Sequence, residues 1–312
     1  MDVGRGRDRH VGRGAPVRVL VTGAGGQLGC DLLDAFADDE VTGRTHAELD
    51  VADEAAVVDA VTGLAPDLVV NAAAWTDVDG CEGDPLRAHA VNALGPWWLA
   101  RACRLVGATL VTVSTEHVFS GPPPHESDGT PRGWTEFDPV APANVYGRTK
   151  AAGEELVRRT LPEHHIVRTS WVTGARGRNF VTAILGAART RDHLEVVDDE
   201  VGAPTSTRDL SVAIRELAVS GRFGTWHRTG AGTVSRLEQA RAIVALAGLD
   251  VEVRPISAAE LTRPAARPSW SVLDATHATA AGLTPLPHWR DGLVRLLEEL
   301  GELADPASSS AS

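Results

Sequence analysis

Short apolar runs alternate along this chain with segments in which apolar residues recur every three or four positions. The runs at 17–23, 67–74 and 109–115 predict buried strands, and the segments at 28–36 and 84–106 have the spacing of helices. Strands that alternate with helices predict an α/β fold with a doubly wound parallel sheet. Binding and catalytic groups are then expected at the carboxyl ends of the strands.

The strand and helix signals become less regular in the second half of the chain. Helices are predicted at 178–189, 207–220 and 235–247. The last begins at Ser235, a good N-cap, with Glu238 at the capping-box offset. We expect substrate selectivity to reside in this half.

A glycine-rich turn follows the first predicted strand directly. Gly23, Gly26 and Gly29 have the spacing Gly-x-x-Gly-x-x-Gly, and Gln27 and Leu28 lie within it. Such glycines let the backbone approach a pyrophosphate, and the following helix points its positive N-terminus at the phosphates. This context predicts a Rossmann-type dinucleotide site.

The end of the second strand bears on the choice between the two nicotinamide dinucleotides. Sites for NAD usually carry an acid there, whereas this chain has Arg44 and His46. An arginine would suit the 2′-phosphate of NADP, although an ordinary surface arginine is an equal alternative. Asp50 and Val51 follow at a position that could contact the adenine.

The only tyrosine and the only lysine of the chain, Tyr146 and Lys150, are four residues apart. On a helix they would share a face, and Asn144 could cap that helix. We expect the ammonium to lower the pKa of the phenol, which would make a proton-transfer pair. The proline- and glycine-rich segment 120–142 precedes the pair and is long enough to be an active-site lid.

Composition narrows the classes of protein. The net charge of −12 argues against a nucleic-acid partner, and no apolar stretch reaches the length of a membrane span. The three cysteines have no metal-ligand spacing and fit a reducing cytoplasm. Arginine replaces lysine almost everywhere, which indicates a GC-rich genome such as an actinomycete's.

With these residues in view, the chain resembles the dTDP-4-dehydrorhamnose reductase family of extended short-chain dehydrogenase/reductases. The likeness covers nearly the whole chain. It is carried by these stretches: Val70–Asp79, Ser114–Phe119, Asn144–Lys150, Val167–Trp171, Gly202–Thr205 and Ala266–Leu273.

The resemblance implies a role for individual residues. Tyr146 would protonate the C4 oxygen of a keto-sugar as hydride arrives from NADPH or NADH, Lys150 would also bind the nicotinamide ribose, and Thr115 would hold the C4 oxygen. Trp171 would lie against the sugar. The remaining residues expected to line the dinucleotide or the nucleotide side of the substrate are Gly26, Gln27, Leu28, Ala72, Ala73, Ala74, Arg267 and Ser271.

The chain departs from the family at the end of the fourth strand. The family usually has Ser-Thr-Asp-Tyr-Val-Phe, and this chain has Glu116 and His117 in place of the aspartate and tyrosine. Because these positions touch or border the hexose, we count Glu116 among the substrate-binding residues. We therefore expect these two positions to bear on the identity of the sugar.

The resemblance also implies an organisation in domains. We expect an NAD(P)-binding domain at 16–173 completed by segments from the second half, and a smaller C-terminal substrate-binding domain at 174–304. Composition predicts a disordered leader at 1–15 and a disordered tail at 305–312. The partner would be a dTDP-linked keto-sugar. A homodimer and a magnesium ion are further expectations that rest on the family alone.

Three other functions stay open at this point. A related dTDP-sugar 4-ketoreductase of antibiotic biosynthesis, for example in the dihydrostreptose pathway, would use the same residues. A dehydratase or epimerase would need an acid and a base beside Thr115, commonly as Thr-Asp-Glu. A non-catalytic regulatory subunit of the methionine adenosyltransferase type would not need the Tyr146–Lys150 pair.

Overall fold

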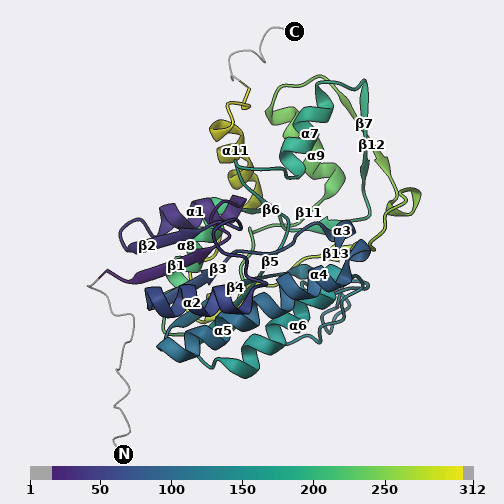
Figure 1. Cartoon of the computed structure of the whole chain (residues 1–312). Helices are drawn as coiled ribbons and strands as arrows, with labels where there is room; N and C mark the ends of the chain where they lie inside the picture. Colours follow the sequence, from purple (N-terminus) through teal and green to yellow (C-terminus); the bar gives the residue numbers. More distant parts are fainter. Residues whose placement is uncertain (1–15, 305–312) are drawn as a thin grey trace, which may run out of the picture.

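The computed structural model describes residues 16–304, in which a six-stranded parallel sheet forms the centre of the larger part (Figure 1). The expected leader and tail lie outside the described residues. The sheet confirms the prediction of a doubly wound α/β fold. From one edge to the other its strands are β2 (Glu40–Arg44), β1 (Arg18–Thr22), β3 (Leu68–Asn71), β4 (Thr109–Thr115), β5 (His164–Thr169) and β10 (Gly224–His227).

Helices cover both faces of this sheet because its strands are apolar on both sides. One face packs against α1 (Gln27–Ala35), α8 (Thr207–Ala218) and α10 (Thr276–Ala280). The other face packs against α2 (Glu54–Leu64), α5 (Gly95–Val106) and α6 (Val145–Thr160). The edge strand β10 and helix α8 come from the second half of the chain, so this layer is not continuous in sequence.

The smaller part of the molecule has its own apolar core beyond the carboxyl ends of the sheet strands (Figure 1). It contains α7 (Phe180–Ala188), β7 (His193–Val197), α9 (Arg236–Leu246), β12 (Glu252–Ile256) and α11 (Trp289–Glu299). Short strands lie between the two parts (Figure 1): β6 (Val172–Thr173) pairs with β9 (Thr205–Ser206), and β8 (Val201–Gly202) pairs with β11 (Val234–Ser235) and β13 (Trp270–Ser271). The single turns η2 (Glu116–Val118) and η3 (Ala258–Glu260) follow β4 and β12.

Local signals placed the helices of the second half correctly. The predicted helices at 178–189, 207–220 and 235–247 are α7, α8 and α9, each shorter than predicted by two or three residues. Ser235 and Glu238 form the expected capping box, in which each side chain accepts a hydrogen bond from the other residue's backbone N–H.

The predicted helix at 84–106 is right in its extent but wrong in its regularity. It consists of α4 (Pro85–His89), a π-helical turn η1 (Ala90–Leu94) and α5, and a separate short helix, α3 (Val78–Gly83), precedes it. The side chain of Asn92, within the π-helical turn, accepts a hydrogen bond from the backbone N–H of Trp75 and donates one to its carbonyl. The long-range contact that accompanies the irregular turn is not visible in the helical pattern.

The interpretation of 120–142 as a lid is also wrong. In this segment, Trp134 pairs through its backbone with Val272 and Asp274, and the Trp270 indole N–H donates to the Arg132 carbonyl. None of its residues lines either of the two cavities described below. The segment covers the chain around β13 instead of closing the site.

Candidate active site

The glycine turn between β1 and α1 has the geometry that a dinucleotide requires. Gly23 has a φ of +71°, and a Cβ there would lie 2.7 Å from the Ala73 backbone nitrogen. A Cβ on Gly29 would overlap the Gly23 carbonyl oxygen. Helix α1 begins after Gly26 without a capping side chain from the described residues. Its first N–H groups are thus available to an anion.

A cavity of about 420 Å³ opens at the carboxyl ends of the central strands. It brings together most of the residues predicted to form the site. They are Gly26, Gln27, Leu28, Gly29, Ala72, Ala73, Ala74, Thr115, Glu116, Tyr146, Lys150 and Trp171. The glycine turn and the proton-transfer pair therefore share one cavity, although they are separated by more than 100 residues in sequence.

Helix α6 presents Tyr146 and Lys150 to this cavity. The Asn144 side chain accepts a hydrogen bond of 2.7 Å from the Gly147 backbone N–H, which confirms the predicted N-cap. Gly147 and Gly153 let the helix approach its neighbours, since a Cβ at either would fall within 2.5 Å of a carbonyl oxygen. Both Tyr146 and Lys150 are buried.

The predicted net lowering of the Tyr146 pKa is wrong, because the pKa is raised in this structure. Burial, and then the charge of Glu116, raise the pKa of the Tyr146 phenol, and only a hydrogen bond with Thr115 opposes them. The Lys150 ammonium donates a 2.6 Å hydrogen bond to the Val113 carbonyl, and burial lowers its pKa to about 8. Tyr146 is consequently held as a neutral phenol, the form that can donate a proton.

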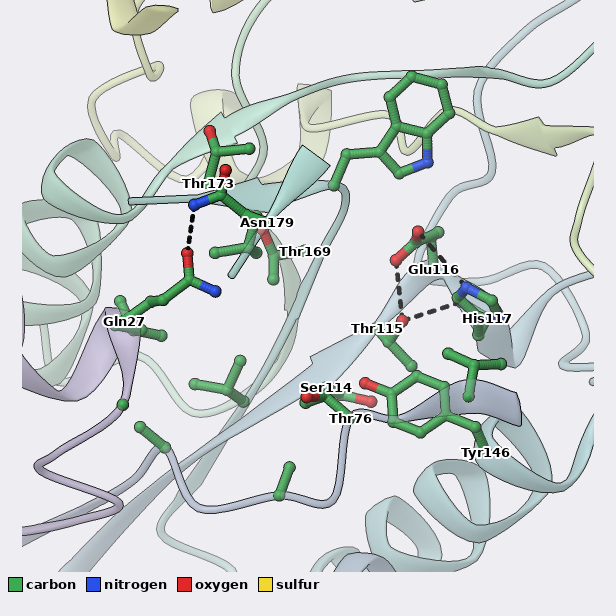
Figure 2. A pocket seen from close by; sticks show the side chains of 18 of the residues that line it. Gln27, Thr76, Ser114, Thr115, Glu116, His117, Tyr146, Thr169, Thr173 and Asn179 are labelled. Carbon is green, nitrogen blue, oxygen red and sulfur yellow. Dashed lines mark hydrogen bonds and ion pairs between the residues drawn. The ribbon is translucent and has the colours of Figure 1, made fainter. Parts of the chain in front are cut away.

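Glu116 and His117, which depart from the family pattern, both line the cavity. The Thr115 hydroxyl donates a 2.8 Å hydrogen bond to the Glu116 carboxylate and accepts one from the His117 backbone N–H (Figure 2). Burial raises the pKa of Glu116 to about 7 and lowers that of His117 to about 3. His117 is therefore neutral at physiological pH, and its Nδ1 lies 2.9 Å from the Asn144 amide nitrogen.

A second cavity of about 430 Å³ adjoins the first and shares Trp171 and Arg236 with it. Arg267 and Ser271, expected on the nucleotide side of the substrate, line this second cavity. Arg267 forms a bidentate ion pair with Asp79, with both N–O distances 3.0 Å, which ties the C-terminal loop to α3.

Arg236 is the main site residue that sequence reasoning missed. Its guanidinium lies 3.4 Å from the centre of the Trp171 ring and 4.7 Å from that of Phe180. Burial lowers its pKa to about 10, so the group stays charged. Trp171 has a φ of +47°, rare for a non-glycine residue, and its indole occupies the space that a Cβ on Gly202 would fill. The sequence offered only the position of Arg236 after an N-cap.

Gln27 and Asn179, which both line the first cavity, form a second interaction that the sequence did not reveal. The Gln27 side-chain oxygen accepts hydrogen bonds from the Asn179 amide (2.9 Å) and the Gly174 backbone N–H (3.1 Å), as Figure 2 shows for Asn179. Gln27 begins α1, and Asn179 caps α7. These bonds join the glycine turn to the smaller part of the molecule.

Comparison with known proteins identifies the family of this site. The family model described as the RmlD substrate binding domain matches residues 17–302. The chain is 42% identical over 303 residues to the dTDP-4-dehydrorhamnose reductase of Mycobacterium tuberculosis (strain ATCC 25618 / H37Rv), with 96% of each chain covered. It is 44% identical over 285 residues to that of Streptomyces griseus, with 88% of this chain and 91% of the relative covered. The chain belongs to the dTDP-4-dehydrorhamnose reductase family.

A solved structure of the same family agrees with the fold. The dTDP-4-dehydrorhamnose reductase of Bacillus anthracis str. Ames, in complex with NADP, matches with a TM-score of 0.87 and 35% identity. The match covers 91% of this chain and 100% of that chain. The resemblance stated from the sequence is thereby confirmed.

Four predicted cofactor-binding residues of this family member do not line either cavity. Gly23 shapes the turn from behind, and Val51 is buried against Gly95. Arg44 is exposed at the end of β2, and the Asp50 carboxylate accepts a hydrogen bond from the Ala52 backbone N–H. Contacts from Arg44 and Asp50 to a dinucleotide stay predictions.

Nothing in residues 16–304 supports the magnesium ion implied by the resemblance. Within that range, no group of three or more His, Cys, Asp or Glu side chains is arranged to hold a metal. Nor does any helix of the described chain have the length and apolarity needed to cross a membrane. Cys30, Cys81 and Cys103 are free thiols.

Proposed function

We propose that the protein reduces the C4 keto group of a dTDP-linked 6-deoxy-4-keto-hexose with NAD(P)H, and that its substrate is dTDP-4-dehydro-L-rhamnose. The observation that carries the proposal is that Thr115, Tyr146 and Lys150 line the same cavity as the glycine turn. The names of the two bacterial relatives and the NADP complex of the Bacillus anthracis protein support it.

In this proposal each side chain has one task. The bound nicotinamide supplies the hydride to C4. The phenol of Tyr146 donates its proton to the C4 oxygen, and the Thr115 hydroxyl holds that oxygen in place. The Lys150 ammonium, with a pKa of about 8, is largely charged at neutral pH and stabilises the negative charge that develops there.

The second cavity fits the nucleotide part of the substrate. Arg236, Arg263 and Arg267 line it, and guanidinium groups match the planar oxygens of a diphosphate. Trp171, shared by both cavities, lies where the hexose would pass between them. A small keto-acid or steroid would have no diphosphate to contact these guanidinium groups, two of which also pair with Glu200 and Asp79.

The substrate is tested by the turnover of purified protein with NADPH. We expect a higher kcat/KM with dTDP-4-dehydrorhamnose than with dTDP-4-keto sugars of other configuration. A preference for another of these sugars would favour the antibiotic-pathway alternative, and Glu116 with His117 would be the first positions to exchange for the family's Asp and Tyr. The absence of turnover with every keto-sugar would favour the non-catalytic alternative.

We predict that NADPH is used at least as well as NADH. Arg44 lies at the end of β2, and its backbone carbonyl accepts a hydrogen bond of 3.0 Å from Ala24 in the glycine turn. The guanidinium is thus near the expected position of the 2′-phosphate. Arg44→Ala should lower kcat/KM for NADPH about tenfold, equivalent to about 1.4 kcal/mol, and leave that for NADH nearly unchanged.

The control for this prediction is Arg104→Ala, which removes an exposed arginine of α5 that lines neither cavity. It should change kcat/KM neither for NADPH nor for NADH. A strong preference for NADH that persists in Arg44→Ala would contradict the assignment of Arg44 to the 2′-phosphate.

Two expectations from the family, a homodimer and the use of magnesium, stay predictions, as does the cytoplasmic location expected from the cysteines. Sedimentation of the purified protein would test the first.

A further inference from the structure

Each reduction leaves a proton deficit inside a buried site. In the proposed function Tyr146 gives its only acidic proton to the C4 oxygen, so the phenolate must be protonated again before the next turnover. Burial opposes the phenolate form, because it raises the pKa of this phenol. A proton source within hydrogen-bond reach is therefore required.

The hydrogen bonds at the end of β4 connect Tyr146 to such a source. The Thr115 hydroxyl lies between the Tyr146 phenol and the Glu116 carboxylate, 2.8 Å from Glu116 Oε2 (Figure 2). The Thr115 hydroxyl is also close enough to the Tyr146 phenol to lower its pKa. Glu116 is only 5% exposed, yet it faces the cavity from which water and product leave.

Resting on the proposed function, we propose that Glu116 returns the proton to Tyr146 through the Thr115 hydroxyl. The phenolate takes the proton of Thr115 Oγ1, and Thr115 Oγ1 takes the proton of the Glu116 carboxyl group. Two O–H bonds break and two form, and nothing is oxidised or reduced. The Glu116 carboxylate then takes a proton from water that enters the cavity when product leaves.

The ionisation of Glu116 suits this task. Burial raises its pKa to about 7, against the smaller opposing effects of the Thr115 hydrogen bond and the Arg236 charge. Near neutral pH the carboxyl group is therefore about half protonated and can both give and take a proton. An aspartate or glutamate in water would be almost entirely ionised.

The other titratable groups around Tyr146 and Glu116 are less suitable. From η2, His117 is neutral, because burial lowers its pKa to about 3, and from α3, Cys81 stays a thiol, because burial raises its pKa to about 11. Arg236 from α9 keeps its proton at a pKa of about 10. On α6 itself, Lys150 is the competing source, and its ammonium donates to the Val113 carbonyl.

Glu116→Gln tests the proposal, because the amide keeps the size of the side chain and a hydrogen bond to Thr115 but supplies no carboxyl proton. We expect the first turnover, measured by rapid mixing with NADPH and dTDP-4-dehydrorhamnose, to be slowed much less than the later turnovers. Steady-state kcat should fall about tenfold or more. The variant should therefore show a burst of one NADPH oxidised per site, followed by a slow phase.

The pH profile provides the second readout. Glu116 is protonated below its pKa, so wild-type kcat should fall as the pH rises through about 7. Glu116→Gln should lack this limb. Glu116→Asp, which keeps a carboxyl group, should restore the limb and most of the steady-state rate. If the Gln variant does not fold, Glu116→Ala should regain turnover in added acetate.

Either of two results would overturn the proposal. One is a steady-state rate and pH profile of Glu116→Gln equal to those of the wild type, which would assign the proton supply to Lys150. The other is an equal slowing of the first and later turnovers, which would mean that Glu116 only positions Thr115 or the sugar. If the proposed function is wrong, the wild-type protein itself does not turn over the keto-sugar. If only the role of Glu116 is wrong, the wild type turns over the sugar, and the error shows in the comparison with Glu116→Gln.

Discussion

Tyr146→Phe should lower kcat by about a hundredfold or more, because it removes the proton donor and leaves the rest of the site in place. The ring packs with Cys81 and Val145 and lies edge-on to the His117 ring at 5.3 Å between centres. Phenylalanine keeps these contacts. Steady-state and single-turnover rates should both fall, since the first hydride transfer already needs the phenol proton.

NADPH binding, measured by the change in its fluorescence, should stay within about twofold in Tyr146→Phe, because the ring is kept and only one hydroxyl is lost. The melting temperature should also be nearly unchanged. An unimpaired kcat would refute the role of Tyr146 as proton donor. A loss of activity that follows a loss of folding would mean that the hydroxyl stabilises the fold.

Arg168→Met should destabilise the fold by about 3–5 kcal/mol, because it leaves a buried carboxylate without its main partner. Arg168 on β5 binds both oxygens of Glu154, at 2.9 and 2.6 Å, and both side chains are about 3% exposed. Glu154 also accepts a 2.6 Å hydrogen bond from Ser114, the residue before Thr115. The same change should therefore also disturb the site.

Denaturant unfolding measures this loss. The double variant Arg168→Met with Glu154→Leu should recover part of it, because it removes the uncompensated charge as well. Arg159→Met is the matched control, since it breaks an exposed ion pair with Glu155 on the same helix and should cost less than about 1 kcal/mol. A loss in Arg168→Met as small as that of the control would contradict the assigned importance of the pair.

The sequence by itself determined the parts of this protein whose signals are local. Strand 109–115, the glycine turn, the Asn144 cap and the shared helix face of Tyr146 and Lys150 were all predictable, because strand alternation, caps and helical spacing act over a few residues. The resemblance then extended this pattern to a family. Together they were sufficient to predict the parallel sheet and most of the residues that line the cavity.

Tertiary structure alone decided the interactions between residues far apart in the chain. Arg236 meets Trp171, Gln27 meets Asn179, and β10 becomes the sheet edge beside β5 only because the chain returns from the second half. No local period encodes such contacts, since they depend on which surfaces the folded elements bring together.

The ionisation of the site was likewise beyond the sequence. The spacing of Tyr146 and Lys150 predicted a lowered phenol pKa, whereas burial beside Glu116 raises it. Desolvation depends on every atom packed around a group, and in this cavity it is the largest cause of the raised pKa. The sequence thus predicted the residues of the proton-transfer pair, and the fold decided their protonation states.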